Sequence, residues 1–123
     1  MKFSRHAIKR LLQRGMSEDI CKVVCMYGKQ KFLPGSAIGF TLTSETCRDI
    51  ASELRTLNRG RKIDNKPRYL RNIIAYMHES NFMDNTKKFT KKIRRLIELL
   101  EKGIPISIIQ SEDGIVITAY YVR

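Results

Sequence analysis

The sequence contains no long hydrophobic run. None of its apolar stretches approaches the roughly eighteen consecutive residues that a membrane-spanning helix needs. Basic residues occur near the start, but polar residues interrupt every apolar stretch that follows them, so there is no secretory signal core. These absences exclude a membrane-spanning protein. They predict a cytoplasmic protein that has no membrane partner.

Cysteine is scarce and does not occur in metal-binding pairs. Cys21, Cys25 and Cys47 make an odd number, and no C-x-x-C spacing is present. Without a secretion signal, reduced thiols are the simplest interpretation. A zinc site that adds His78 is conceivable, since Cys21 and Cys25 share a helical face, but the usual paired loop spacing is missing. We therefore expect buried free thiols, with no metal and no cofactor.

Acidic residues are few. The chain has 12 Asp and Glu against 24 Lys and Arg, which gives a net charge of +12. Such an excess favours polyanionic partners, of which nucleic acid is the commonest and an anionic membrane surface is the alternative. The charge predicts partners and not a fold.

The remaining composition is that of a folded domain. With 123 residues, of which 42% are apolar, the chain is expected to form a single domain over residues 1–123. Helical periodicity and turn residues predict an α+β fold, in which N-terminal helices pack on a small antiparallel sheet and residues 58–102 form a basic helical insertion. The predicted helices start at Ser4, Ser17, Thr43 or Ser44, Pro67 and about Thr86, and the predicted strands cover 29–33, 37–42, 104–109 and 115–122.

Two of the predicted strands carry more specific expectations. Gly39 inside the second strand indicates a bulge or a close backbone approach. On the last strand, alternation puts Val116, Thr118 and Tyr120 on one face of the sheet.

The opening helix carries the most distinctive pattern. Ser4 is a candidate N-cap, and Gly15 marks the end of the helix. An apolar stripe of Ala7, Ile8, Leu11 and Leu12 is expected to be buried. On another face, one imidazole and two guanidiniums recur every four residues, as His6, Arg10 and Arg14. Such a face could hold and attack a phosphodiester.

The two ends of the chain resemble a known family. Ser4-x-His6-Ala7-x-x-Arg10 followed by Arg14-Gly15-Met16-Ser17 looks like the opening of the family called domain of unknown function 4258, whose members typically read S-x-H-A-x-x-R and then R-G-[IM]-S. The closing pattern of that family, an acidic-Gly turn and a strand ending in Thr-x-Tyr, is matched by residues 113–120. Tyr27-Gly28-Lys29 and residues 34–38 resemble its central segment. The resemblance covers roughly residues 3–55 and 104–121.

The resemblance implies a fold and a set of active residues. The family is similar to the superfold of barnase, the EndoU nucleases, colicin D and the RelE-type toxins, many of which cut RNA without a metal. By this resemblance, His6, Arg10, Arg14 and Thr118 fall where such enzymes place active residues. Several members of the superfold are inactive, so the fold alone does not confer activity.

The residue types suit metal-free RNA cleavage. An imidazole titrating near neutrality can take the proton of the 2′-hydroxyl. Guanidiniums bind phosphate and stay charged as negative charge accumulates on it. We predict that His6 transfers the proton, that Arg10 and Arg14 hold the phosphate, and that Thr118 positions it. The product would be a 2′,3′-cyclic phosphate. Tyr120 or Lys29 could assist proton delivery.

Structural interpretations compete with each of these roles. A single histidine near a helix start is more often solvated than catalytic. Arg10 and Arg14 could form a solvated face or pair with Glu18 and Asp19, and Thr118 could be an ordinary strand residue.

A second prediction concerns basic residues that could bind nucleic acid through its phosphates. Most lie in two adjoining segments that contain few acids, where contact with nucleic acid is more probable than a merely solvated face. The candidates are Lys29, Arg59, Arg61, Lys62, Lys66, Arg68, Arg71, Lys87, Lys88, Lys91, Lys92, Arg94 and Arg95.

These observations leave three functions open. The leading hypothesis is a small, toxin-like RNA-cleaving hydrolase that acts on tRNA, mRNA or ribosome-associated RNA and is inhibited by an acidic antitoxin. The alternatives are a non-catalytic nucleic-acid-binding protein and an interaction module for an acidic protein partner.

Overall fold

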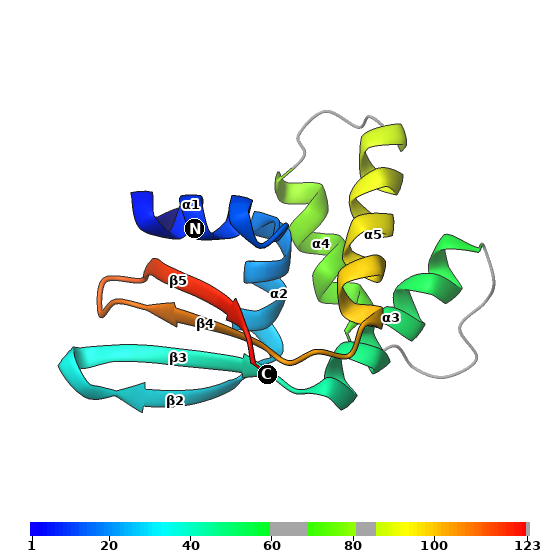
Figure 1. Cartoon of the computed structure of the whole chain (residues 1–123). Coiled ribbons are helices and arrows are strands. Elements are labelled where there is room, and N and C mark those ends of the chain that lie inside the picture. The colour runs from blue at the N-terminus through cyan, green and yellow to red at the C-terminus, as the bar shows by residue number, and fades with distance from the viewer. Residues whose placement is uncertain (60–68, 81–85, 123) are drawn as a thin grey trace. The chain divides into compact units, whose positions relative to one another are not determined.

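The computed structural model describes residues 1–59, 69–80 and 86–122, and for 77–80 and 86–89 it describes the backbone alone. The elements in chain order are β1 (Lys2–Phe3), α1 (Arg5–Gln13), α2 (Glu18–Tyr27), β2 (Lys29–Leu33), a 3-10 turn (Pro34–Ser36), β3 (Ala37–Leu42), α3 (Ser44–Asn58), α4 (Leu70–Ser80), α5 (Thr86–Glu101), β4 (Ile106–Gln110) and β5 (Ile115–Tyr121) (Figure 1). The predicted α+β fold is confirmed.

The chain divides into two compact units. The first contains Met1–Thr46 and Ile104–Arg123, and the second contains Cys47–Gly103. The predicted insertion 58–102 lies within the second unit, which also includes most of α3. The organisation as a single domain stays a prediction.

A five-stranded sheet forms the first unit's framework. Its strand order is β1-β5-β4-β3-β2. The pairs β2–β3, β3–β4 and β4–β5 are antiparallel, as predicted, but β1 pairs parallel with β5. The sheet is therefore mixed and not purely antiparallel. The sequence did not predict β1 because two residues are too few to show alternation.

Thr118 and Tyr120 share one face of the sheet as predicted, but the prediction that Val116 lies on that face is wrong. Thr118 lies opposite Ile109 and Val116 lies opposite Gln110, so Ile117 is an extra residue in β5 and forms a bulge. Because a bulge shifts the alternation by one residue, the register puts Val116 on the face of Ala119. Both of these side chains are fully buried. Thr118 therefore lies on the other face.

Gly39 does not form a bulge; instead, another residue packs closely against its backbone. Gly39 stays in register between Lys31 and Ile109. A Cβ at this position would lie 3.3 Å from Cδ1 of Leu33, so the missing side chain makes room for that leucine.

Two capped helices complete the first unit. The Ser4 hydroxyl accepts from the Ala7 N–H at 3.0 Å and the Ser17 hydroxyl accepts from the Ile20 N–H at 3.3 Å, so both predicted caps are confirmed. Gly15 has a φ of 63°, the left-handed conformation expected of a helix stop. Helix α1 lies alongside β5, and α2 packs against β3 and β4 (Figure 1). The buried side chains include Ala7, Leu11, Ile20, Val23, Val24, Leu42, Ile106 and Ile108.

The apolar stripe of α1 is narrower than predicted. Ala7 and Leu11 are buried, whereas Ile8 is 47% exposed and Leu12 is 78% exposed. Each residue of a helix is rotated by about 100° from the one before it. Since residues 7 and 11 occupy the buried side of this short helix, 8 and 12 turn toward solvent.

The second unit has a helical core. Its fully buried side chains include Cys47, Ile50 and Leu54 of α3, Ile73 of α4, and Ile93, Leu96 and Leu100 of α5, at or below 2% exposure. These positions recur at the three- and four-residue spacing of an amphipathic helix. The Glu53 carboxylate of α3 accepts from the backbone N–H groups of Tyr69, at 2.9 Å, and Leu70, at 3.2 Å, and so caps the start of α4.

Two neighbouring leucines of α1 provide a matched test of the helix orientation. We expect Leu11→Ala to lower the free energy of unfolding by about 2–5 kcal/mol, because Leu11 is 5% exposed and its loss leaves a cavity. Leu12→Ala should change it by less than about 0.5 kcal/mol. Urea denaturation of the two variants measures both values. Equal effects would contradict the orientation of α1.

Candidate functional site

His6 and Arg10 are in direct contact on the exposed side of α1. The Nε–H of Arg10 donates to Nε2 of His6 at 3.3 Å, and an Nη1–H of Arg10 donates to the Gln13 side-chain oxygen at 3.3 Å. One turn of helix separates the imidazole from the guanidinium, which is why the spacing of four residues brings them together. In this contact Nε2 of His6 is the acceptor, because a guanidinium can only donate.

Arg14 has a different environment. Its side chain is half-buried, and its Nη1 donates to the backbone carbonyl of Ala119 in β5. Within the described residues, neither Arg10 nor Arg14 forms an ion pair with Glu18 or Asp19. A guanidinium has five N–H donors, so one bond to β5 leaves others for a ligand.

Thr118 is half-buried on β5, next to the residue that Arg14 contacts. The structure therefore brings His6 and Arg10 together and ties Arg14 to the strand of Thr118. No hydrogen bond within the described part of the chain links the Thr118 side chain to the other three residues. Its register position, opposite Ile109, puts it on the face away from Val116 and Ala119.

Ser4 is a positioning residue that sequence reasoning identified only as a helix cap. Its backbone N–H donates to the Val116 carbonyl at 2.9 Å and its hydroxyl donates to the Ile117 carbonyl at 3.4 Å. With the bond from Arg14 to Ala119, α1 is fastened to β5 near both of its ends. Only the tertiary structure could show these bonds, because the partners are more than a hundred residues apart.

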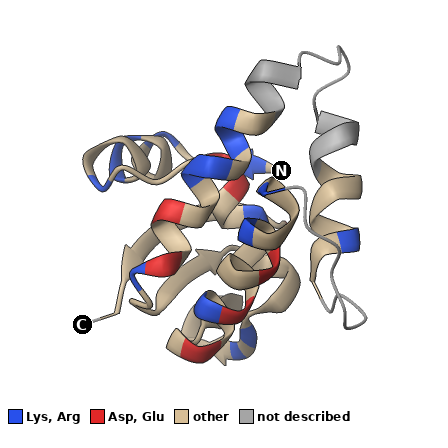
Figure 2. Cartoon of the chain, turned by 90° about the vertical axis from the view of Figure 1, so that its right-hand side faces the viewer, with Lys and Arg blue, Asp and Glu red and all other residues tan. Residues whose placement is uncertain are grey.

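The predicted nucleic-acid-binding residues are partly described. The side chains of Lys29, Arg59, Arg71, Lys91, Arg94 and Arg95 are exposed, and that of Lys92 is half-buried. Arg61, Lys62, Lys66 and Arg68 lie outside the described residues. So do the side chains of Lys87 and Lys88, which belong to α5. Figure 2 marks the positions of Lys and Arg along the ribbon.

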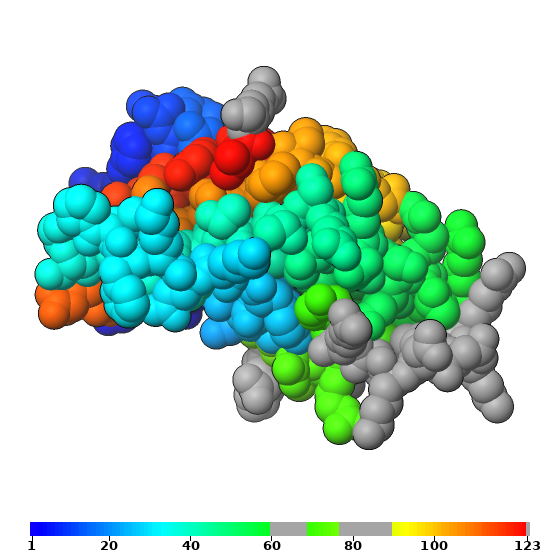
Figure 3. Space-filling view, turned by 90° about the horizontal axis from the view of Figure 1, so that it is seen from below, coloured from blue at the N-terminus to red at the C-terminus, as the bar shows by residue number. Residues whose placement is uncertain are grey.

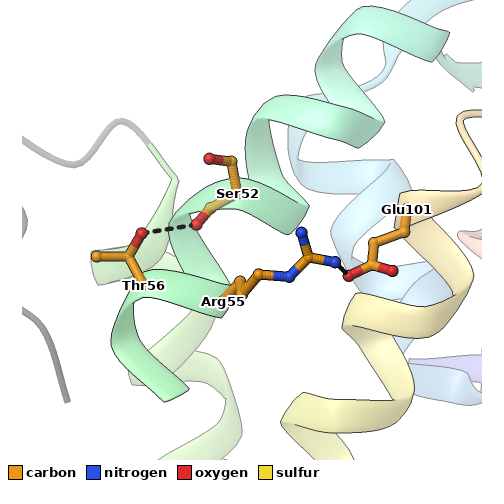
Figure 4. Close-up of polar contacts among 4 residues, drawn as sticks. All are labelled: Ser52, Arg55, Thr56 and Glu101. Carbon is orange, nitrogen blue, oxygen red and sulfur yellow. Dashed lines mark hydrogen bonds and ion pairs between the residues drawn. The ribbon is translucent and has the colours of Figure 1, made fainter. Parts of the chain in front are cut away.

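A shallow hollow in the second unit collects charges that the sequence did not single out. The hollow has a volume of about 240 Å³ and is lined by Arg48, Ser52 and Arg55 of α3 together with Glu101 of α5. Arg55 forms an ion pair with Glu101, as Figure 4 shows. Gly103 makes room for Arg48, since a Cβ there would lie 2.6 Å from the arginine Nε. Helical spacing of four and seven residues could have grouped the three α3 residues.

Burial raises the pKa of all three cysteines. Removal from water raises the pKa of Cys21 to about 12, helped by nearby Cys25, Glu18 and Asp19. Burial also raises the pKa of Cys25 to about 11, although Lys22 opposes the shift, and that of Cys47 to about 11, although Arg48 opposes it. None of the three is in a disulfide, and Cys25 accepts a bond from the Gln110 amide at 3.6 Å.

Thiol labelling tests this effect of burial. At pH 8 a thiol of pKa 11 is ionised in about one molecule in a thousand, whereas an unfolded cysteine of pKa about 8.5 is ionised in about a quarter. We expect alkylation of the native protein to be at least about a hundredfold slower than in urea. The native rate should rise about tenfold per pH unit until the pH approaches 11. Equal rates with and without urea would contradict the raised pKa values.

The described residues contain no group of His, Cys, Asp and Glu side chains arranged to hold a metal ion. None of the helices in the described ranges is long and apolar enough to cross a membrane.

Comparisons with known proteins give no relatives. No protein-family model matches the chain, and no curated protein or solved structure is significantly similar to it.

Proposed function

We propose that this protein is a metal-independent RNA-cleaving nuclease that uses His6 and Arg10. The observation that carries the proposal is their direct contact on an exposed helix face, which presents an imidazole next to a permanent positive charge. The helix has no acidic residue, and the chain as a whole carries a net charge of +12, so a polyanion is attracted to it.

The proposed reaction is an internal phosphoryl transfer. The neutral imidazole of His6 takes the proton of the RNA 2′-hydroxyl, whose oxygen then bonds to the adjacent phosphorus. The bond from phosphorus to the 5′-oxygen breaks, and that oxygen takes up a proton from water. The products are a 2′,3′-cyclic phosphate and a free 5′-hydroxyl. Because the RNA supplies its own nucleophile, the proposed route does not call for a metal-activated water.

The arginines stabilise the negative charge that develops on the phosphate oxygens during this transfer. The hydrogen bond from Arg10 to His6 is replaced by one to a phosphate oxygen when RNA binds, which also frees the imidazole lone pair. Arg14, anchored on β5, adds a second guanidinium, and Thr118 can orient a phosphate oxygen. The resemblance of the chain ends to the domain of unknown function 4258 family, and to the nuclease superfold, supports the same assignment.

The finer parts of the proposal follow from the reaction and the charge. We propose that the enzyme acts in the cytoplasm on tRNA, mRNA or ribosome-associated RNA. Unregulated, it is toxic to its own cell, so an acidic inhibitor protein that covers the basic surface is the partner that charge complementarity favours.

Replacement of His6 tests the proposed function. Incubated with total RNA and a chelator, the wild-type protein should give fragments that end in cyclic phosphate. His6→Ala should cut about 10²–10⁴ times more slowly, which is the usual contribution of a general base. His78→Ala removes the other histidine of the chain and should cut normally. RNA binding should survive in both variants.

Two results would contradict the assignment. His6→Ala cutting as fast as the wild type would show that the imidazole is not the base. Absence of fragments from the wild-type protein, under conditions in which it binds RNA, would favour the second candidate function.

That second candidate is non-catalytic binding of nucleic acid through the helices of the second unit. The observation that favours it is the exposure of Arg71 on α4 and of Lys91, Arg94 and Arg95 on α5. Long cationic side chains that stay in solvent contact phosphates without reading the bases.

The salt dependence of RNA binding tests the role of α5. If both arginines contact phosphates, Arg94→Gln combined with Arg95→Gln should reduce the slope of log affinity against log salt by about 1.4 on single-stranded RNA. Lys2→Gln combined with Lys102→Gln removes the same charge from residues outside the predicted set and should change the slope little. Equal slopes for the two double variants would contradict specific contact by α5.

A further inference from the structure

We propose that strand β2 binds unpaired RNA, with the ring of Phe32 stacked against a base and Lys29 and Lys31 contacting the neighbouring phosphates. This inference rests on the proposed function, because it defines the substrate as single-stranded RNA. It adds Phe32 and Lys31, which the sequence pattern did not indicate.

Strand β2 is an edge strand with an open surface. It pairs only with β3 and ends the strand order of the sheet. Four consecutive side chains, Lys29 to Phe32, are exposed, and only Leu33 is half-buried. In Figure 3, β2 and the turn that follows it (cyan) lie at the surface of the first unit. An extended ligand can therefore reach the whole strand.

Phe32 is the unusual residue of this strand. Its side chain is 78% exposed, although a phenylalanine is normally buried. The register puts it on the same face as Gln30, beside Ile38 of β3. Helix α2 packs against β3 and β4 and leaves the ring uncovered. The result is a flat aromatic surface held on a paired strand, which is what a stacking base requires.

Charge selects nucleic acid as the occupant. Lys29 and Lys31 alternate with Gln30 and Phe32, so they lie on the opposite face of the same open edge strand. There is no acidic residue from Lys29 to Ser44. Proteins that bind single strands combine aromatic side chains with a positively charged track for the backbone. A protein strand pairing with β2 is the competing occupant, but lysines on an edge strand act against such pairing.

The position of β2 in the sheet determines that the bound RNA must be extended and unpaired. Strands β3 and β4 separate it from β5, so the two strands are about 14 Å apart across the sheet. Since α1 lies alongside β5, one RNA strand that reaches both Phe32 and the His6–Arg10 pair must extend over several unpaired nucleotides. A duplex keeps its bases stacked inside and cannot offer one to Phe32.

A fluorescence experiment tests the stacking directly. The natural chain has no tryptophan, so Phe32→Trp introduces a single reporter at this position. The probe is a single-stranded oligonucleotide of about ten 2′-deoxy nucleotides, within the usual site size and unable to be cut by 2′-hydroxyl attack. We expect its binding to quench the tryptophan, whereas the same strand in a duplex should not.

Affinity measurements with the same probe complete the test. Phe32→Ala should bind the single strand about tenfold more weakly with an unchanged salt slope, because it loses stacking and no charge. Phe32→Tyr should restore the affinity. Leu12→Ala is the matched control, since Leu12 is also 78% exposed, and it should bind normally. Circular dichroism checks that each variant is folded.

Two outcomes would overturn the proposal: unchanged affinity in Phe32→Ala, or an unquenched tryptophan at saturation. If sedimentation showed that the wild-type protein self-associates and that Phe32→Ala abolishes this while oligonucleotide binding is unchanged, the proposal would also fall. That result would identify β2 as a protein-docking strand. Because the probe cannot be cut, loss of stacking is measured separately from cleavage. A failure of His6 as a base would leave the result at Phe32 standing.

Discussion

The attachment of α1 to β5 is the constraint on which the candidate site depends. Ser4 bonds to the carbonyls of Val116 and Ile117, and Arg14 bonds to the carbonyl of Ala119. The bulge at Ile117 is part of this arrangement, because it lets one serine bond to two consecutive carbonyls. Among the described residues, no strand other than the two-residue β1 pairs with that side of β5, and the side chains of the residues that cap the first helix satisfy part of the backbone of β5.

This attachment explains how a helix of nine residues can present reactive groups in a fixed geometry. A helix of that length is marginal in isolation, since nucleation is costly and few hydrogen bonds follow. Bonds near its two ends, together with the burial of Ala7 and Leu11, remove that freedom. His6 and Arg10 then project from an anchored element, so under the proposed function little entropy would be lost when they engage a phosphate.

The two units contribute different chemistry to the proposed activity. In the first unit, the imidazole and guanidinium of α1 lie beside the sheet, and the uncovered aromatic ring of Phe32 belongs to its edge strand β2. In the second, exposed arginines lie opposite a core of leucine and isoleucine, an arrangement suited to sequence-independent contact with phosphates. Specificity for unpaired RNA would arise in the first unit, and affinity would be shared by both.

Local patterns in the sequence were sufficient for much of this molecule. The caps Ser4 and Ser17, the stop at Gly15, both strands of the β2–β3 hairpin and the buried stripes of α2 and α3 follow from interactions within a few residues, and the structure contains them. The contact between His6 and Arg10 belongs to the same class, because helical spacing alone brings residues four apart together.

Other features needed partners that lie far away in the chain. The parallel pairing of β1, the bulge that puts Thr118 and Val116 on opposite faces, and the bond from Arg14 to Ala119 each depend on what β5 meets after folding. The exposure of Leu12 and Phe32 has the same origin, since an apolar residue is buried only where another element covers it. The sequence by itself determined which residues could do chemistry. The tertiary structure decided which of them are buried, which are anchored and which remain available to a ligand, because those properties arise from contacts between segments and not from either segment alone.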